Sequence, residues 1–166
     1  MPSSSPSRAR RLIVYAGRAV AVEYDEPRGA RLVAFLFGHA PQQPALPPDV
    51  VYRLRWFAAS GRLGLYRDDQ LIFLGAAEGA LAELLQGEVC RHLAQCGRGG
   101  LLFHAACVCQ GAQALILPGE SAAGKSTLAA WLTTQGYGYL GDELALIPSG
   151  SLEVQPLIRP LSLKRP

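Results

Sequence analysis

Short apolar runs separated by turn-forming residues fill the first part of the chain. They are rich in leucine, valine and aromatic residues, and they occupy residues 12–22, 31–37, 50–57, 63–66 and 71–74. Runs of this length between turn residues predict strands. We expect a small, mostly antiparallel β region, with a proline-rich loop over residues 40–48 and a hairpin turn over residues 67–70.

A helical period replaces these runs after residue 75. Apolar residues now recur every three or four positions, at Leu81, Leu84, Leu85, Val89 and Leu93. This spacing predicts a helix over residues 76–95 with one buried face.

The last third of the chain is expected to form a strand, a loop, a helix and a strand. Two apolar runs, residues 101–109 and 112–117, predict paired strands, and the second leads into a glycine-rich segment. A helical stretch over residues 126–135 and an apolar run over residues 137–147 follow. This order is typical of a nucleotide-binding α/β unit.

We therefore predict an α/β protein, α+β overall, in three parts. These parts are a disordered tail over residues 1–10, a β-rich region over residues 11–75 and a partial nucleotide-binding domain over residues 76–166. Hydrophobic residues make up 49% and charged residues 17% of the chain, which predicts a globular protein. No apolar run reaches the roughly 18–20 residues that span a bilayer. We therefore expect a soluble protein that does not associate with a membrane.

Charge and cysteine content exclude two further classes. The net charge is +3 and the arginines are scattered, whereas a nucleic-acid-binding protein concentrates them on one surface. Cys90, Cys96, Cys107 and Cys109 lack the spacing of a zinc site, so we expect buried free thiols. Free thiols without a secretion signal predict a cytoplasmic protein.

The glycine-rich segment is a phosphate-binding P-loop. Its residues fit the pattern G-x-x-x-x-G-K-S and are Gly119, Glu120, Ser121, Ala122, Ala123, Gly124, Lys125 and Ser126. The glycines let backbone N–H groups face an anion at the start of a helix. Lys125 is expected to reach the β- and γ-phosphates, and the Ser126 hydroxyl to bind Mg²⁺. The pattern thus predicts a nucleoside triphosphate and Mg²⁺ as ligands.

Three further residues are candidates for the chemistry. Asp142 and Glu143 are expected at the end of a strand beside the P-loop strand, where one carboxylate can bind Mg²⁺ and the other can accept a proton. A pair of exposed acids at a strand end is the alternative. His104 is expected in the strand that pairs with the P-loop strand, either as a hydrogen-bonded core residue or as a catalytic one.

Together these motifs resemble the HPr kinase-related family of P-loop serine kinases, whose core is similar to that of ATP-dependent phosphoenolpyruvate carboxykinase. The resemblance is carried by residues 103–106 (Phe-His-Ala-Ala), 118–127, 138–143 (Gly-Tyr-Leu-Gly-Asp-Glu) and 158–164 (Ile-Arg-Pro-Leu-Ser-Leu-Lys). It implies an ATP- and Mg²⁺-dependent kinase that phosphorylates a serine of a protein or peptide, with GTP left open as donor. Related kinases form oligomers, so a homo-oligomer is compatible with it.

The resemblance also assigns roles. His104 matches the family's active-site histidine, Lys125 and Ser126 match its phosphate and metal contacts, and Thr127 closes the matched segment. Asp142 and Glu143 match a pair of acids that is usually two aspartates. We assign Asp142 as the base and Glu143 as the metal ligand, with the reverse division left open. Both acids thus count as candidate metal ligands.

Family members continue for about a hundred residues or more beyond the matched segment. We therefore expect this chain to be a fragment or a natural truncation. This expectation favours an alternative to a kinase, a nucleotide-binding module without kinase activity. A P-loop hydrolase, which would release phosphate without an acceptor, is a third alternative.

Overall fold

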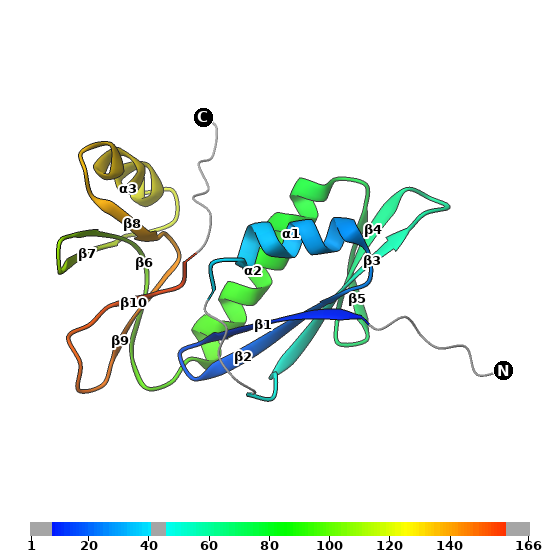
Figure 1. The fold of residues 1–166 in the computed structure, drawn as a ribbon, viewed down its shortest axis with the longest axis horizontal. Coiled ribbons are helices and arrows are strands. Elements are labelled where there is room, and N and C mark those ends of the chain that lie inside the picture. The colour runs from blue at the N-terminus through cyan, green and yellow to red at the C-terminus, as the bar shows by residue number, and fades with distance from the viewer. Residues whose placement is uncertain (1–7, 41–45, 159–166) are drawn as a thin grey trace. The chain divides into compact units, whose positions relative to one another are not determined.

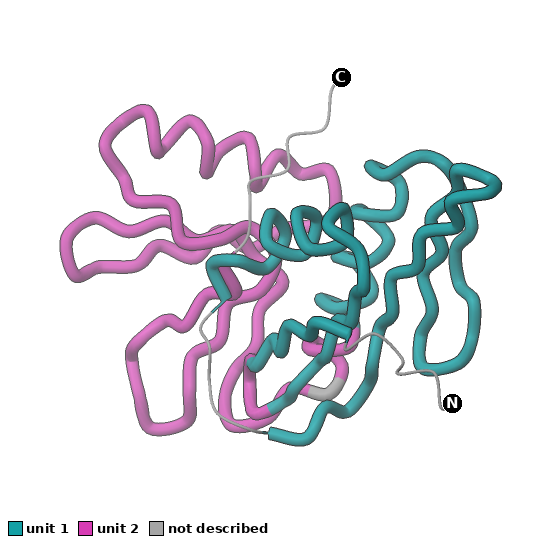
Figure 2. Tube along the Cα trace, turned by 45° about the vertical axis from the view of Figure 1, so that its right-hand side comes forward, with its two compact units in different colours: residues 1–14, 18–91 teal, residues 15–17, 92–166 magenta. Residues whose placement is uncertain are grey.

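The computed structural model describes residues 8–40 and 46–158, apart from the side chain of Cys96. The described residues form two compact units (Figure 2). Unit 1 holds residues up to position 91 except 15–17, and unit 2 holds residues 15–17 and those from position 92 onward. Within the described ranges, two sheets and three helices make this an α+β protein (Figure 1).

Unit 1 is built on a five-stranded sheet of order β1-β2-β3-β4-β5. Its strands are β1 (Ala9–Tyr15), β2 (Arg18–Tyr24), β3 (Val50–Phe57), β4 (Arg62–Arg67) and β5 (Gln70–Gly75). β3, β4 and β5 pair antiparallel, as expected, but β2 and β3 are parallel. The parallel pair arises because a helix, and not a hairpin, connects these two strands.

That helix, α1 (Pro27–Phe37), corrects the strand expected over residues 31–37. Pro27 stands in the first turn, where its missing N–H costs nothing and its fixed φ suits a helix. Leu32, Val33, Leu36 and Phe37 are buried, and their spacing gives one apolar helical face. Periodicity alone does not separate a helix from a strand in a run this short.

Both helices of unit 1 cover the same face of its sheet. A Cβ at Gly29 of α1 would lie 2.8 Å from the Tyr24 side chain and 3.7 Å from that of Leu54. Tyr52 donates a hydrogen bond to Glu88 of α2 (Glu78–Cys96), the helix expected over residues 76–95. Because alternate residues of β3 share a face, α1 and α2 both pack on the side of Tyr52 and Leu54.

The turns of unit 1 follow local rules. The apolar run over residues 12–22 is divided by Ala16 and Gly17, whose φ angles of 51° and 70° fit a type I′ hairpin turn. The hairpin turn expected over residues 67–70 is confirmed, with Asp68 at a φ of 51°. β1 begins at Ala9, inside the expected tail, and the loop over residues 40–48 lies partly outside the described residues.

Unit 2 is organised around one long central strand, β6 (Gly100–Gln110). Its other strands are β7 (Gln113–Pro118), β8 (Gly138–Gly141), β9 (Leu144–Pro148) and β10 (Gln155–Pro156). β7 pairs with one edge of β6, whereas β8 and β9 pair with the other, all antiparallel. The expected pairing of the strands over residues 101–109 and 112–117 is confirmed.

One expectation for this sheet is wrong. The strand that precedes Asp142 was expected beside the P-loop strand β7, but β8 pairs with β6, which therefore separates β8 from β7. Since both are antiparallel to β6, β7 and β8 run parallel to each other on its two sides. The connection between them contains α3 (Lys125–Thr134), the helix expected over residues 126–135.

Helix α3 packs against β6, β7 and β8 through a core of small residues. Ala106 and Val108 of β6 and Ala129 of α3 are each 0% exposed, and small side chains let helix and sheet approach closely. Partly buried residues surround this core, namely Leu117, Leu132, Tyr137 and Tyr139. The core fixes the start of α3, and hence the P-loop, above one face of β6.

The thiols and the apolar character of the helices were also predicted from the sequence. Cys90, Cys107 and Cys109 carry reduced thiols; the first two are buried and the third is half-buried. Burial raises the pKa of the Cys107 thiol to about 11. None of the helices in the described part of the chain combines the length and apolar character that crossing a bilayer requires.

Candidate functional site: a phosphate loop and an acid pair

The P-loop connects the end of β7 to the first turn of α3. Ala122 and Gly124 have φ angles of 67° and 83°, both left-handed, whereas Ala123 between them does not. Alternation of right- and left-handed residues curls successive N–H groups toward one concave side, which is the geometry of an anion-binding nest. The glycine at position 124 and the alanine at position 122 thus shape the loop.

Lys125 lies over this loop. Its Nζ donates hydrogen bonds to the carbonyl oxygens of Gly119 and Glu120, each at 2.7 Å. The ammonium group is therefore held at the beginning of the loop while its Cα begins α3. A phosphate in the loop would find this charge beside it, as the motif predicts.

The first turn of α3 offers further anion-binding groups. Gly124 is the N-cap and provides no side-chain cap, so the N–H groups of Lys125, Ser126 and Thr127 depend on other partners. The helix dipole places a partial positive charge at the same end. Ser126 is half-buried and Thr127 is exposed. Loop and helix start together fit an oxyanion such as a phosphate.

The strand that leads into the P-loop and the acid pair both lie next to the same residue of β6, on its two sides. Ala105 pairs with Pro118, the last residue of β7, and its N–H donates to the carbonyl oxygen of Glu143 at 3.2 Å. Two strand spacings separate the backbones of Pro118 and Glu143, which amounts to about 10 Å. The carboxyl ends of β7 and β8 therefore open at the same level of the sheet, where open α/β sheets bind ligands.

His104 and Glu143 form a pair at this level. His104 Nε2 lies 3.2 Å from Glu143 Oε2, and their side chains are 55% and 31% exposed. His104 is two residues from Ala106, so strand alternation places it on the face of β6 that α3 covers further along. The histidine is thus an accessible residue beside the acid pair and not a core residue.

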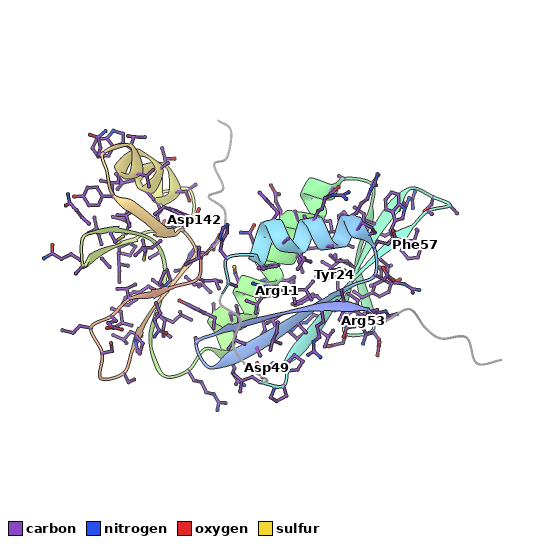
Figure 3. All side chains as sticks on the ribbon, viewed as in Figure 1. Arg11, Tyr24, Asp49, Arg53, Phe57 and Asp142 are labelled. Atoms are coloured by element: carbon purple, nitrogen blue, oxygen red, sulfur yellow. The ribbon has the colours of Figure 1, made fainter. Side chains whose placement is uncertain are left out.

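Asp142 has a different environment from its neighbour. It is 2% exposed, and its Oδ1 accepts a hydrogen bond from Tyr139 Oη at 3.0 Å. Figure 3 labels Asp142 where the chain leaves β8. Because Tyr139 packs against the core under α3, this hydrogen bond links the Asp142 carboxylate to that core. Asp142 and Glu143 are therefore not simply two exposed acids at a strand end.

The donor atoms near the loop fit Mg²⁺. The Ser126 hydroxyl and the Asp142 and Glu143 carboxylates supply hard oxygen ligands. No group of three or more His, Cys, Asp or Glu residues that could hold a metal is found in the described ranges. Mg²⁺ commonly takes one or two protein carboxylates and completes its shell with water and phosphate oxygens.

The residues of this candidate site, except Tyr139, were named from the sequence. The available signal was a tyrosine three residues before an aspartate, in an apolar run. That spacing has no fixed meaning in a strand, and a β-bulge near Leu140 decides how the two side chains meet, because Val108 pairs with Tyr139 and Cys107 with Gly141. Residues 159–164 of the resembling segment lie outside the described residues.

No protein-family model, curated protein sequence or solved structure matches this chain. The resemblance to HPr kinase-related proteins therefore stays a prediction from the motifs, and the site must be judged by its own geometry.

Proposed function

We propose that unit 2 binds ATP and Mg²⁺ through its P-loop and transfers the γ-phosphoryl group to a serine hydroxyl of a protein or peptide, in the manner of an HPr kinase-related P-loop kinase. The observation that carries this proposal is the meeting at Ala105, where the P-loop strand ends on one side and the acid pair lies on the other. Phosphoryl transfer needs both an anion cradle and carboxylates near the same phosphate.

The residues divide the work as follows. Lys125 and the N–H groups of the first turn of α3 hold the phosphates and neutralise charge that develops on them. Ser126 and an acid would hold Mg²⁺, which would supply further positive charge to the phosphates. The serine oxygen forms a bond to the γ-phosphorus, the bond from that phosphorus to the bridging oxygen breaks, and the hydroxyl proton passes to an acid or to His104.

From the sequence we assign Asp142 as the base and Glu143 as the metal ligand. The environments of the two acids favour the reverse assignment. Glu143 is the more exposed acid and already contacts His104, so it can reach an incoming hydroxyl and share its proton with the imidazole. Asp142 is buried and held by Tyr139, which suits a metal ligand, directly or through water. We therefore assign Glu143, together with His104, as the proton acceptor and Asp142 as the Mg²⁺ ligand.

Calorimetric titration with ATP and with GTP, each with and without Mg²⁺, tests the binding half of the proposal. We expect Mg²⁺-dependent binding that Lys125→Ala abolishes, because the loop then lacks its only ammonium group. Lys125→Arg is the matched control, since it keeps the charge. Absence of nucleotide binding by the folded wild-type protein would contradict the proposal.

A second function, nucleotide binding without transfer, is favoured by one observation. All residues from Gly119 to Gly124 are exposed, whereas phosphoryl transfer benefits from a site that excludes water. Incubation with γ-labelled ATP and a serine-containing peptide library separates the alternatives. Labelled peptide supports the kinase, free phosphate alone supports a hydrolase, and binding with neither product supports the nucleotide-binding module.

A further inference from the structure

We infer that Tyr139 is a positioning residue that fixes the Asp142 carboxylate for Mg²⁺ at the P-loop. This inference rests on the proposed function and adds to it a residue that the motifs do not contain.

The first step of the argument is burial. Asp142 is 2% exposed, and burying a carboxylate is costly unless hydrogen bonds compensate for the lost water. Tyr139 Oη donates one such bond to Oδ1 at 3.0 Å. A hydrogen bond to a charged acceptor is worth more than one between neutral groups, so the hydroxyl stabilises the observed orientation of the carboxylate.

The second step is the anchoring of the tyrosine itself. Tyr139 packs against the fully buried cluster of Ala106, Val108 and Ala129, to which β6 and α3 both contribute. Ala129 lies one turn along the helix that begins with Lys125. The position of the hydroxyl, and through it the position of Asp142, is therefore tied to the element that carries the P-loop.

The third step is the backbone on the other side of Asp142. A Cβ at Gly141 would lie 3.0 Å from the carbonyl oxygen of Leu157, so the chain that follows β10 is packed closely against this point. Leu157 N also donates to the carbonyl oxygen of Leu144 at 3.0 Å. Main-chain packing thus holds the backbone of Asp142 in place, and the hydrogen bond from Tyr139 acts on its carboxylate.

Tyr139→Phe tests the inference because it removes the hydroxyl and keeps the packed ring. Groups that orient a metal ligand typically change metal affinity by 10- to 100-fold, so we expect the gain in ATP affinity on adding Mg²⁺ to fall by about 10-fold. ATP affinity without metal should be unchanged. Tyr137→Phe is the matched control, since Tyr137 packs against the same core; it should keep the full Mg²⁺ effect.

A double-mutant cycle separates positioning from mere packing. In the Asp142→Asn protein, Tyr139→Phe should cause no further loss of Mg²⁺ dependence, because the oriented carboxylate is already gone. An undiminished Mg²⁺ effect in Tyr139→Phe, or an equal loss in both backgrounds, would overturn the inference. So would a loss of metal-free ATP affinity as large as the loss of the Mg²⁺ effect.

Failure of the proposed function has a different signature. If the folded wild-type protein binds no ATP, the proposed function is wrong, and Mn²⁺ binding without nucleotide, followed by water proton relaxation, then decides the role of Tyr139. Mn²⁺ binding that weakens in Tyr139→Phe and not in Tyr137→Phe supports the inference. Absence of Mn²⁺ binding to the wild-type protein overturns it as well.

Discussion

Tyr52 Oη donates a hydrogen bond to Glu88 Oε2 at 3.1 Å and thereby joins β3 to α2 inside unit 1. Glu88 is 8% exposed and also pairs with Arg91 and, at 3.5 Å, with Arg67. One buried acid therefore connects a sheet to a helix through a hydroxyl and two guanidinium groups. Removing either end of this network should cost stability in unit 1 without touching the candidate site.

Glu88→Gln tests the acid. The substitution keeps the shape but removes the charge that two arginines and a hydroxyl share, so we expect the free energy of unfolding to fall by about 1–3 kcal/mol. Glu83→Gln on the exposed side of the same helix is the control and should change it little. Urea unfolding followed by circular dichroism measures both; equal effects would show that the network contributes nothing.

Tyr52→Phe tests the hydroxyl through pH dependence. Burial first, and then the charge of Glu88, raise the pKa of Tyr52 well above its ordinary value of 10.0. Above pH 10 the unfolded chain loses this proton while the folded protein keeps it, so wild-type stability should fall as pH rises through this range. The difference in free energy of unfolding between wild type and Tyr52→Phe should therefore shrink from pH 9 to 11; a constant difference contradicts the assignment.

His104→Gln and Glu143→Gln test the proton-accepting pair. Each should lower the rate of peptide phosphorylation by about 10²–10⁴-fold, the usual contribution of a general base, while ATP affinity stays close to that of the wild type. His39→Gln, at an exposed position in unit 1, is the control for the histidine and should keep the wild-type rate. A variant of the pair that retains full rate removes its residue from the proposed chemistry.

Ala122→Gly tests the shape of the P-loop. A left-handed alanine is strained by roughly 1–2 kcal/mol, which offsets the entropic cost of a glycine. The neighbouring Ala123 has no positive φ, so Ala123→Gly should only destabilise. We expect Ala122→Gly to be the more stable variant by about 1 kcal/mol in thermal unfolding. The opposite order would mean that the loop does not hold position 122 left-handed.

Local signals in the sequence located most of the elements of the fold. The period of α2, the glycines around the P-loop and the acids at Asp68 and Asp69 specify helix, loop and turn through contacts between near neighbours in the chain. The P-loop residues and the acid pair were proposed in the same way, because the chemistry expected of them is tied to fixed spacing. Helix α1 was missed because a seven-residue apolar run fits a strand and a helix equally well.

Tertiary structure decided what long-range contacts control. The parallel pairing of β2 with β3 and the place of β6 between β7 and β8 depend on which strands bury each other's faces, and no local pattern encodes that choice. The same holds for the bond from Tyr139 to Asp142, which needs a bulge in β8 and a core beneath α3. The sequence by itself determined which groups are candidates for binding a phosphate and a metal, because that prediction depends on residue type and spacing. Only packing between distant segments decided which acid is buried and which stays accessible.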